Sequence, residues 1–114
     1  MLSASQERLL ERFVEGLRFD GYDDYHVRPI QPGNDSGLHA QGWQGRFLML
    51  SSTVRLEIFG QTFDFAEGES YEVLPDVTHR EVFGNENPIL VIARKDSGKP
   101  LPPVKPEFTL QRLR

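Results

Sequence analysis

Residues 54–65, with the sequence VRLEIFGQTFDF, decide the fold class. Apolar and polar side chains alternate along this stretch on both sides of Gly60. A period of two places one set of side chains on a buried sheet face and the other set in water. The stretch therefore predicts a β-hairpin that turns at Gly60.

Further strands are predicted on the C-terminal side, at residues 82–83 and 89–93, which are rich in Val, Ile, Leu and Phe. Turn-forming residues separate the strands at short intervals: Pro32-Gly33-Asn34-Asp35, Glu67-Gly68, Asp76 and Gly84-Asn85-Glu86-Asn87-Pro88. Short strands between regularly spaced turns are typical of all-β sandwiches and barrels. We therefore predict one all-β domain over residues 22–95.

The first residues follow a different period. Between Ser3 and Leu17 the apolar residues recur every three to four positions, which predicts an amphipathic helix: Leu9, Leu10, Phe13, Val14 and Leu17. Ser3 and Gln6 have the spacing of a capping box, and Gly16 or Gly21 is the expected end. We expect this segment, residues 1–21, to pack on the barrel or on a dimer partner.

The C-terminal residues 96–114 differ in composition from the rest of the chain. Residues 99–106, KPLPPVKP, contain four prolines and are predicted to form an extended tail rather than a strand. The last residues, 108–114, carry enough apolar side chains to dock on the chain's own barrel or on a neighbour.

Composition limits the possible functions. The chain has 114 residues, no cysteine and a net charge of -4, which excludes disulfides and thiolate zinc sites and gives no basic footprint for nucleic acid. The longest apolar run has four residues, 47–50, far short of a membrane span, and no basic segment precedes an apolar block at the start. We expect a cytoplasmic protein whose partner is a small molecule or another protein.

Two segments contain the residues most suited to a functional site, at regular distances from glycines. Gly33 is followed after five residues by His39-Ala40-Gln41, and then after three residues by Gly45. The second segment begins at Gly68, eleven positions before His79, with Pro75 and Asp76 between them. Asp accepts left-handed backbone conformations, so a turn can form at Asp76.

These spacings resemble the two motifs of the cupin family. The first motif is Gly-x5-His-x-His-x3–4-Glu-x6-Gly, and here Gln41, Gly45 and Ser52 replace three of its markers. The second is Gly-x5-Pro-x-Gly-x2-His-x3-Asn, of which Gly68 and His79 remain. The resemblance spans about residues 25–95 and implies a double-stranded β-helix barrel, here a small single-domain cupin with a degenerate first motif.

The resemblance also implies a divalent metal, such as Fe, Mn, Ni or Zn, held by His39, Gln41 and His79. On a strand, residues two apart point to the same side, so His39 and Gln41 can face one centre. The family's Glu is missing at Gly45, and Glu81 could replace it, act as a pocket acid, or simply pair with an arginine. Two hydrogen-bonded pocket histidines without a metal remain the alternative.

Other residues are candidates for contact with a ligand. Trp43, Met49 and Tyr71 share the parity of the two histidines and are expected to line the barrel interior. Arg46 points inward only if a β-bulge forms near Gly42 or Gly45, and outward otherwise, which we favour. His26 lies outside both motifs and is interpreted as an ordinary strand residue.

Three functional hypotheses follow. The first is a cupin barrel that binds a small molecule in its interior, with or without a metal. The second is a metal-dependent enzyme, a dioxygenase, isomerase or lyase, in which Glu81 is the catalytic acid or base. The third is a non-catalytic barrel selected for dimer formation, since exposed sheet edges favour pairing into a homodimer. Fold alone does not choose among them.

Overall fold

The computed structural model describes residues 2–95 and 110–112. The predicted proline-rich extended segment lies outside these residues. The elements are α1 (Ala4–Phe19), β1 (Asp24–Pro29), β2 (Gln44–Ser51), β3 (Val54–Ile58), β4 (Gln61–Phe65), β5 (Ser70–Val73), β6 (His79–Phe83), β7 (Ile89–Lys95) and β8 (Leu110–Arg112). The predicted all-β class with one N-terminal helix is therefore confirmed.

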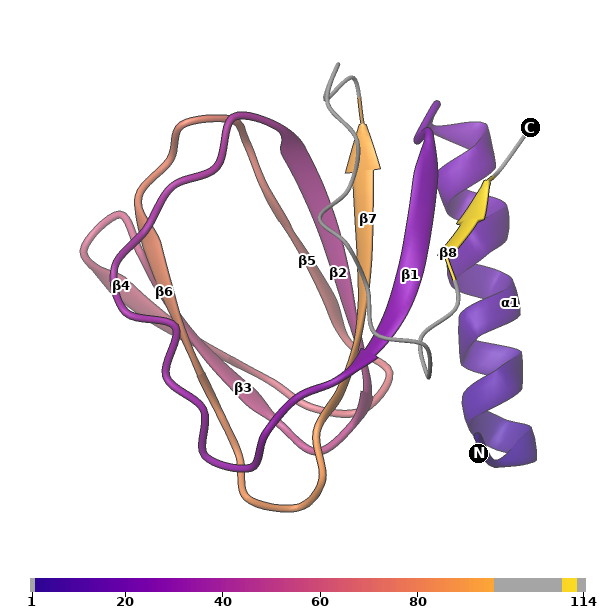
Figure 1. The fold of residues 1–114 in the computed structure, drawn as a ribbon, viewed down its shortest axis with the longest axis horizontal. Helices are drawn as coiled ribbons and strands as arrows, with labels where there is room; N and C mark the ends of the chain where they lie inside the picture. The colour runs from indigo at the N-terminus through magenta and orange to yellow at the C-terminus, as the bar shows by residue number, and fades with distance from the viewer. Residues whose placement is uncertain (1, 96–109, 113–114) are drawn as a thin grey trace.

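The strands form two antiparallel sheets that face one another (Figure 1). The larger sheet has the order β5-β2-β7-β1-β8 and the smaller has the order β4-β3-β6. The connection between β1 and β2 runs beside β6 and pairs with it through isolated bridges at Asp35 and His39. This connection adds a further edge to the smaller sheet, and it brings the first sequence motif against the second.

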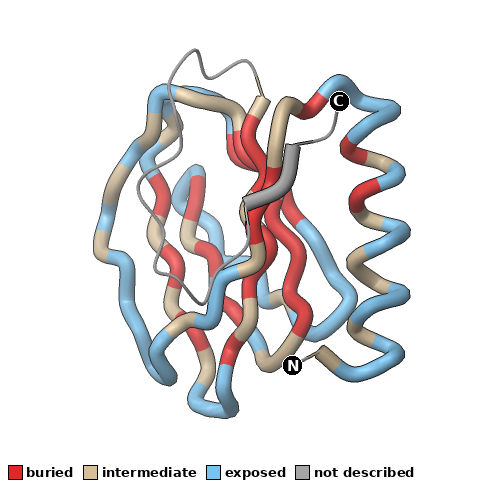
Figure 2. Tube along the Cα trace, turned by 45° about the vertical axis from the view of Figure 1, so that its right-hand side comes forward, coloured by how far each residue is buried: buried red, intermediate tan, exposed pale blue. Residues whose placement is uncertain are grey.

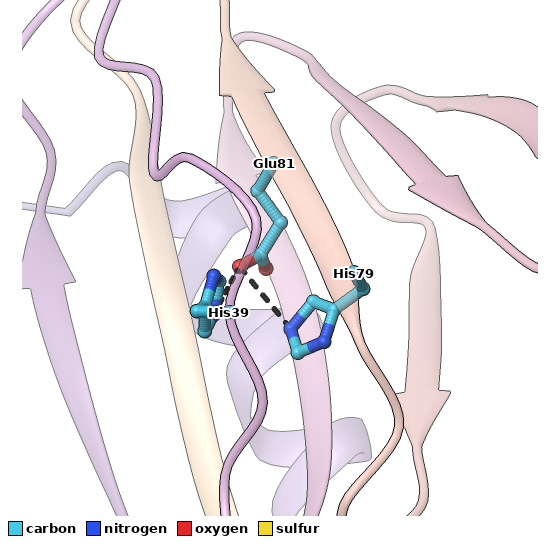
Figure 3. A group of neighbouring side chains, drawn as sticks. All are labelled: His39, His79 and Glu81. Carbon is cyan, nitrogen blue, oxygen red and sulfur yellow. Dashed lines mark ion pairs between the residues drawn. The ribbon is translucent and has the colours of Figure 1, made fainter.

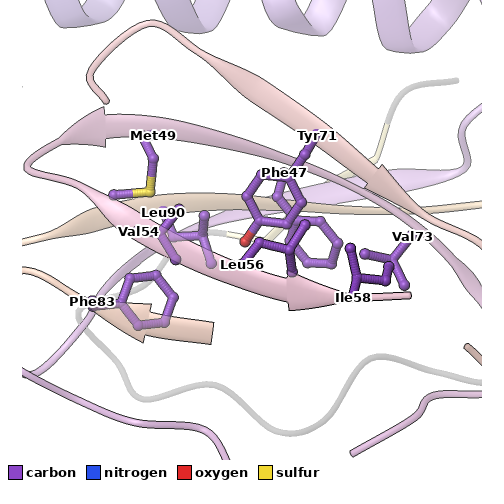
Figure 4. Close-up of a cluster of buried hydrophobic side chains, with 9 residues drawn as sticks. All are labelled: Phe47, Met49, Val54, Leu56, Ile58, Tyr71, Val73, Phe83 and Leu90. Carbon is purple, nitrogen blue, oxygen red and sulfur yellow. The ribbon is translucent and has the colours of Figure 1, made fainter. Parts of the chain in front are cut away.

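Two apolar cores stabilise this arrangement. The first fills the space between the sheets and contains nine buried residues (Figure 4): Phe47, Met49, Val54, Leu56, Ile58, Tyr71, Val73, Phe83 and Leu90. The second lies between α1 and the outer face of the larger sheet and contains Val14, Leu17, Tyr22, Tyr25, Leu48, Leu50, Val91 and Ala93. The central strands of the larger sheet, β2 and β7, therefore have residues buried on both faces, and Figure 2 shows the buried stretches in red.

The helix forms as the sequence predicts. The Ser3 side chain accepts from the Gln6 backbone N–H at 3.1 Å, and the Ser3 N–H donates to the Gln6 side chain at 2.9 Å, so both halves of the capping box are present. The helix ends at Phe19, and Gly21 follows with a φ of +78°. Among the described residues, no helix is both long enough and apolar enough to cross a bilayer.

The predicted hairpin at residues 54–65 is also present, as β3 and β4. Its two turn residues, Phe59 and Gly60, both have positive φ, at +54° and +71°. Two consecutive left-handed residues match the right-handed twist of the flanking strands. Glycine accepts this backbone readily, whereas Phe59 is strained there, and the residue is 76% exposed.

The backbone of β8 pairs with β1, in the register Asp24↔Arg112. The sequence left two docking places for residues 108–114, the chain's own barrel or a neighbour. In the structure, residues 110–112 lie at the edge of the chain's own larger sheet.

Candidate metal centre

Backbone pairing brings the two histidines together. The His39 N–H donates to the His79 carbonyl and the His79 N–H donates to the His39 carbonyl, both at 2.9 Å. The Ser36 N–H donates to the Glu81 carbonyl at 2.9 Å, and the Ser36 hydroxyl accepts from the Glu81 N–H at 2.8 Å. The two imidazole rings consequently lie with their centroids 4.2 Å apart.

An outer ion pair holds the connecting segment in this position. Asp35 accepts from Arg80 Nε at 2.9 Å and makes a second, shorter contact with the same guanidinium. The hydrogen bonds from Arg80 hold the pKa of Asp35 well below its usual range. Because Arg80 is on β6 and Asp35 precedes His39, the pair fixes the segment from the solvent side, opposite the imidazoles.

Glu81 joins the histidines because it lies two residues after His79 on β6, and both side chains face the barrel interior. Its Oε1 lies 3.7 Å from Nε2 of His39 and 3.7 Å from Nε2 of His79. Figure 3 shows the two rings and the carboxylate pointing toward one another. The three donor atoms all lie within 4.8 Å of one another.

The backbone fixes which nitrogen of each ring faces this point. His39 Nδ1 lies 3.0 Å from the Gly37 carbonyl, and His79 Nδ1 lies 2.9 Å from the Val77 carbonyl. A carbonyl only accepts, so each neutral ring carries its proton on Nδ1 and presents a lone pair on Nε2. His79 Nε2 is buried and has no hydrogen-bond partner. This is the arrangement in which imidazoles bind metals, with the second nitrogen held by a backbone carbonyl.

The three donors lie somewhat farther apart than they would around a bound metal ion, so a single ion requires them to move closer together. Two donors bound about 2.1 Å from the same ion lie about 3.0–3.4 Å apart in neighbouring positions. The observed 3.7 Å between Glu81 Oε1 and each imidazole is a few tenths of an ångström longer. His79 is fully buried, whereas the His39 side chain is 36% exposed and lies on a connecting segment, so it has room to make the adjustment.

Tyr71, on β5, donates its hydroxyl to Glu81 Oε2 in a short hydrogen bond. Its ring stacks on Phe47 at 5.0 Å and contacts Phe65 at 4.9 Å. Burial, followed by the charge and hydrogen bond of Glu81, raises the pKa of Tyr71 well above its usual value. Tyr71, predicted as a lining residue, therefore contacts the candidate ligand Glu81 directly.

The other predicted residues lie in different places. Met49 is fully buried in the inter-sheet core, and Trp43 packs at its edge. Gln41 accepts from the Asp76 N–H at its backbone carbonyl, at 2.8 Å, while its side-chain nitrogen is buried without a hydrogen-bond partner. Gln41 as a metal ligand stays a prediction.

Arg46 lies apart from the three donors, because its side chain is on the opposite face of β2. It forms ion pairs with Asp20 at 2.7 Å and with Glu72 at 2.6 Å, and it lies 4.7 Å over the ring of Tyr22. The inward bulge that would have turned Arg46 is absent, since β2 pairs in continuous register with β7 from residue 44 to residue 49. The outward orientation favoured from the sequence is the one found.

The sequence analysis missed a buried cation, Arg94. It is 3% exposed, faces the inter-sheet side of β7 beside Gly45, and its guanidinium lies 4.7 Å over the Trp43 ring. Burial lowers its pKa, against the opposing charge of Asp24. The predicted strand ended at residue 93, two residues before the observed end of β7. The same alternation extended by one residue would have placed Arg94 inside.

Several solved structures have a fold similar to that of this chain. An RmlC-like cupin from Shewanella frigidimarina matches with a TM-score of 0.56 and 15% identity, over 64% of this chain and 66% of that chain. A cupin 2 conserved barrel domain protein from Salinispora arenicola matches with a TM-score of 0.57 and 19% identity, over 65% and 63%. The fold is that of the cupins.

A third cupin-fold match is the polyketide cyclase RemF from Streptomyces resistomycificus, with a TM-score of 0.54 and 18% identity, over 68% of this chain and 58% of that chain. The chain matches less than two thirds of the length of each of these three structures. No protein-family model and no curated protein matches the sequence. The likeness is therefore one of fold, and the chemistry must be argued from this chain's own residues.

The structure explains why this cupin barrel has no carboxylate at Gly45. A Cβ added there would lie 2.6 Å from Cζ of Phe47 and 2.7 Å from Cζ3 of Trp43. Two aromatic rings occupy the space that a glutamate would need. In this cupin-type barrel the carboxylate next to the histidines comes instead from Glu81, on the opposite sheet.

Two shallow hollows occur on the smaller sheet within the described residues. One is lined in part by Leu38, Phe59 and Thr78, and the other in part by Thr53, Arg55 and Gly84. Neither hollow is lined by His39, His79 or Glu81. The three donors are therefore not part of either hollow.

Proposed function

We propose that this chain is a small-molecule-binding cupin barrel whose interior holds one divalent metal ion through His39, His79 and Glu81. The observation that carries the proposal is the convergence of two carbonyl-anchored imidazoles and one carboxylate oxygen. Two neutral nitrogens and one anionic oxygen suit Fe, Zn, Ni and Mn, and they leave a bound divalent ion with a net positive charge.

A set of three protein donors leaves coordination positions open, and a small ligand with oxygen or nitrogen donors would take them. The partly exposed edge of His39 gives such a ligand a way to approach, while the fully buried His79 and nearly buried Glu81 keep bulk water from the other side. The metal supplies Lewis acidity when it is bound. Protein residues supply orientation and exclusion of water.

The same open positions favour a second candidate, a metal-dependent enzyme acting on a small molecule. One cupin-fold neighbour is described as a polyketide cyclase, which supports an enzyme as the second candidate. In this version Glu81 is both a ligand and the group closest to a bound substrate. The enzyme hypothesis is tested by turnover of a metabolite extract: activity present in the wild-type protein must disappear in His79→Ala.

The metal proposal is tested by elemental analysis of the purified protein after incubation with Fe²⁺, Mn²⁺, Ni²⁺ or Zn²⁺ and removal of the excess. We expect close to one ion per chain for the wild type, and much less for His79→Ala and Glu81→Gln. The third histidine provides a matched control, since His26 is buried on β1 and is not among the clustered donors. His26→Asn should retain the metal.

Two outcomes would remove the proposal. A wild-type protein that retains none of the four ions would leave His39 and His79 as hydrogen-bonded pocket histidines. Equal retention by the wild type, His79→Ala and Glu81→Gln would place the ion elsewhere. Circular dichroism of each variant separates loss of the ligand from loss of the fold.

The homodimer stays a prediction, which light scattering of the purified protein tests.

A further inference from the structure

The two oxygens of Glu81 face different partners. Oε1 lies 3.7 Å from both imidazole nitrogens, while Oε2 accepts the hydroxyl proton of Tyr71. A carboxylate can bind a metal with one oxygen or with both. Here one oxygen already has a buried hydrogen-bond donor, so the two modes are not equivalent.

Tyr71 holds its position independently of Glu81. The residue lies on β5, in the larger sheet, opposite Phe47 in the β2 register, whereas Glu81 lies on β6 of the smaller sheet. Its ring is stacked on Phe47 at an interplanar angle of 21° and also contacts Phe65, and the residue is 7% exposed. The hydroxyl is therefore fixed by ring packing and reaches Glu81 across the barrel.

We propose that Tyr71 is the positioning residue of this centre, which holds Glu81 as a ligand through Oε1 alone. The inference rests on the proposed metal function and specifies how its carboxylate binds. In this geometry the phenol blocks Oε2 from the metal and turns Oε1 toward His39 and His79. Three single-atom donors then leave one more coordination position for the small ligand than a two-oxygen Glu81 would.

The Tyr71 hydroxyl acts on the metal only through Glu81. Its removal should therefore change metal binding, whereas removal of a residue that merely supports the fold would change stability. Hydrogen-bond partners of metal ligands typically change metal affinity by about 10–100-fold when they are removed. The Phe side chain keeps the stacking contacts with Phe47 and Phe65, so Tyr71→Phe removes the hydroxyl and little else. The matched control is Tyr22→Phe, because Tyr22 is a buried tyrosine in the other core, on the far face of β2.

The experiment is titration of the full chain with Co²⁺, which reports affinity and coordination in one visible spectrum. We expect one Co²⁺ per chain in the wild type. Tyr71→Phe should weaken binding about 10–100-fold, because Glu81 loses the hydrogen bond that orients it. The visible band should also change, because Glu81 is then free to bind through both oxygens. Tyr22→Phe should match the wild type. In a Glu81→Gln background, adding Tyr71→Phe should change the residual affinity less than twofold.

The results separate the two proposals. If wild-type protein binds no Co²⁺, or if Glu81→Gln binds it as tightly as the wild type, the proposed metal function is wrong and the role of Tyr71 with it. If the wild type binds, Glu81→Gln binds more weakly, and Tyr71→Phe keeps both the affinity and the spectrum of the wild type, only the positioning role is overturned. A Tyr71→Phe effect of the same size in the Glu81→Gln background would also overturn it.

Discussion

Replacing Gly45 with alanine should destabilise the barrel, although glycine to alanine in a strand is ordinarily favourable. The added Cβ would lie 2.6 Å and 2.8 Å from two ring atoms of Phe47 and 2.7 Å from Cζ3 of Trp43. Neither ring moves freely, since Phe47 is stacked on Tyr71 and the Arg94 guanidinium lies over Trp43. The three contacts therefore have to be relieved by shifting packed side chains.

The expected cost follows from two opposing effects. Overpacking of a well-filled interior costs about 1–3 kcal/mol. Loss of the unfolded chain's freedom at a glycine returns about 0.4–1 kcal/mol, because Gly45 does not have a positive φ. The free energy of unfolding should therefore fall in Gly45→Ala, by about 1.3 kcal/mol when the middle of each range is taken.

Urea unfolding followed by circular dichroism measures this change, and Gly16→Ala is the matched control. Gly16 lies within α1, and the nearest atom to an added Cβ, on Arg46, is 3.9 Å away. Alanine there should stabilise the protein by about 0.5–1 kcal/mol through helix propensity. The same substitution thus has opposite signs at the two sites. A Gly45→Ala protein at least as stable as the wild type would refute the packing explanation for the missing carboxylate.

Three further predictions concern stability. Phe59→Asn should raise the free energy of unfolding by about 0.5–1 kcal/mol, measured in urea, because asparagine accepts the left-handed turn conformation and Phe59 is 76% exposed; a loss of stability would contradict this. The depressed pKa of Asp35 means that its pairing with Arg80 stabilises the fold above about pH 4 and is lost as the pH falls through the folded-state pKa. In Asp35→Asn the His39 amide should therefore exchange with solvent faster at pH 7, and unchanged exchange would argue against the ion pair as the support of this segment. Burial, and then neighbouring arginine charges, lowers the pKa of His26, so the unfolded state binds the extra proton first and stability falls as the pH drops below about 6.5. His26→Asn should flatten thermal stability between pH 5 and 7, and an unchanged slope would rule His26 out as its source.

Much of the fold was predictable because it depends on local patterns. The alternation at residues 54–65 and the capping pair Ser3 and Gln6 specify a hairpin and a helix through interactions between near neighbours. That His39 and His79 would meet was implied by the resemblance of the two segments to the cupin motifs. The reciprocal backbone bonds that join them link segments forty residues apart, and no local pattern specifies such a pairing.

The centre itself was only partly predictable. Glu81 could be found because it shares the parity of His79 on one strand. The Tyr71 contact with Glu81 crosses from one sheet to the other, so its partner could not be read from either strand alone. The absence of a side chain at Gly45 was visible in the sequence, but its cause, the two rings that close over the backbone, depends on tertiary packing.

The central claim is that His39, His79 and Glu81 form one metal site, and anomalous X-ray scattering tests it most directly. Crystals grown with Zn²⁺ and measured above the zinc absorption edge should show one strong peak about 2.1 Å from Nε2 of both histidines and from Oε1 of Glu81. No peak among these three atoms, in crystals whose protein is otherwise folded as described, would contradict the account.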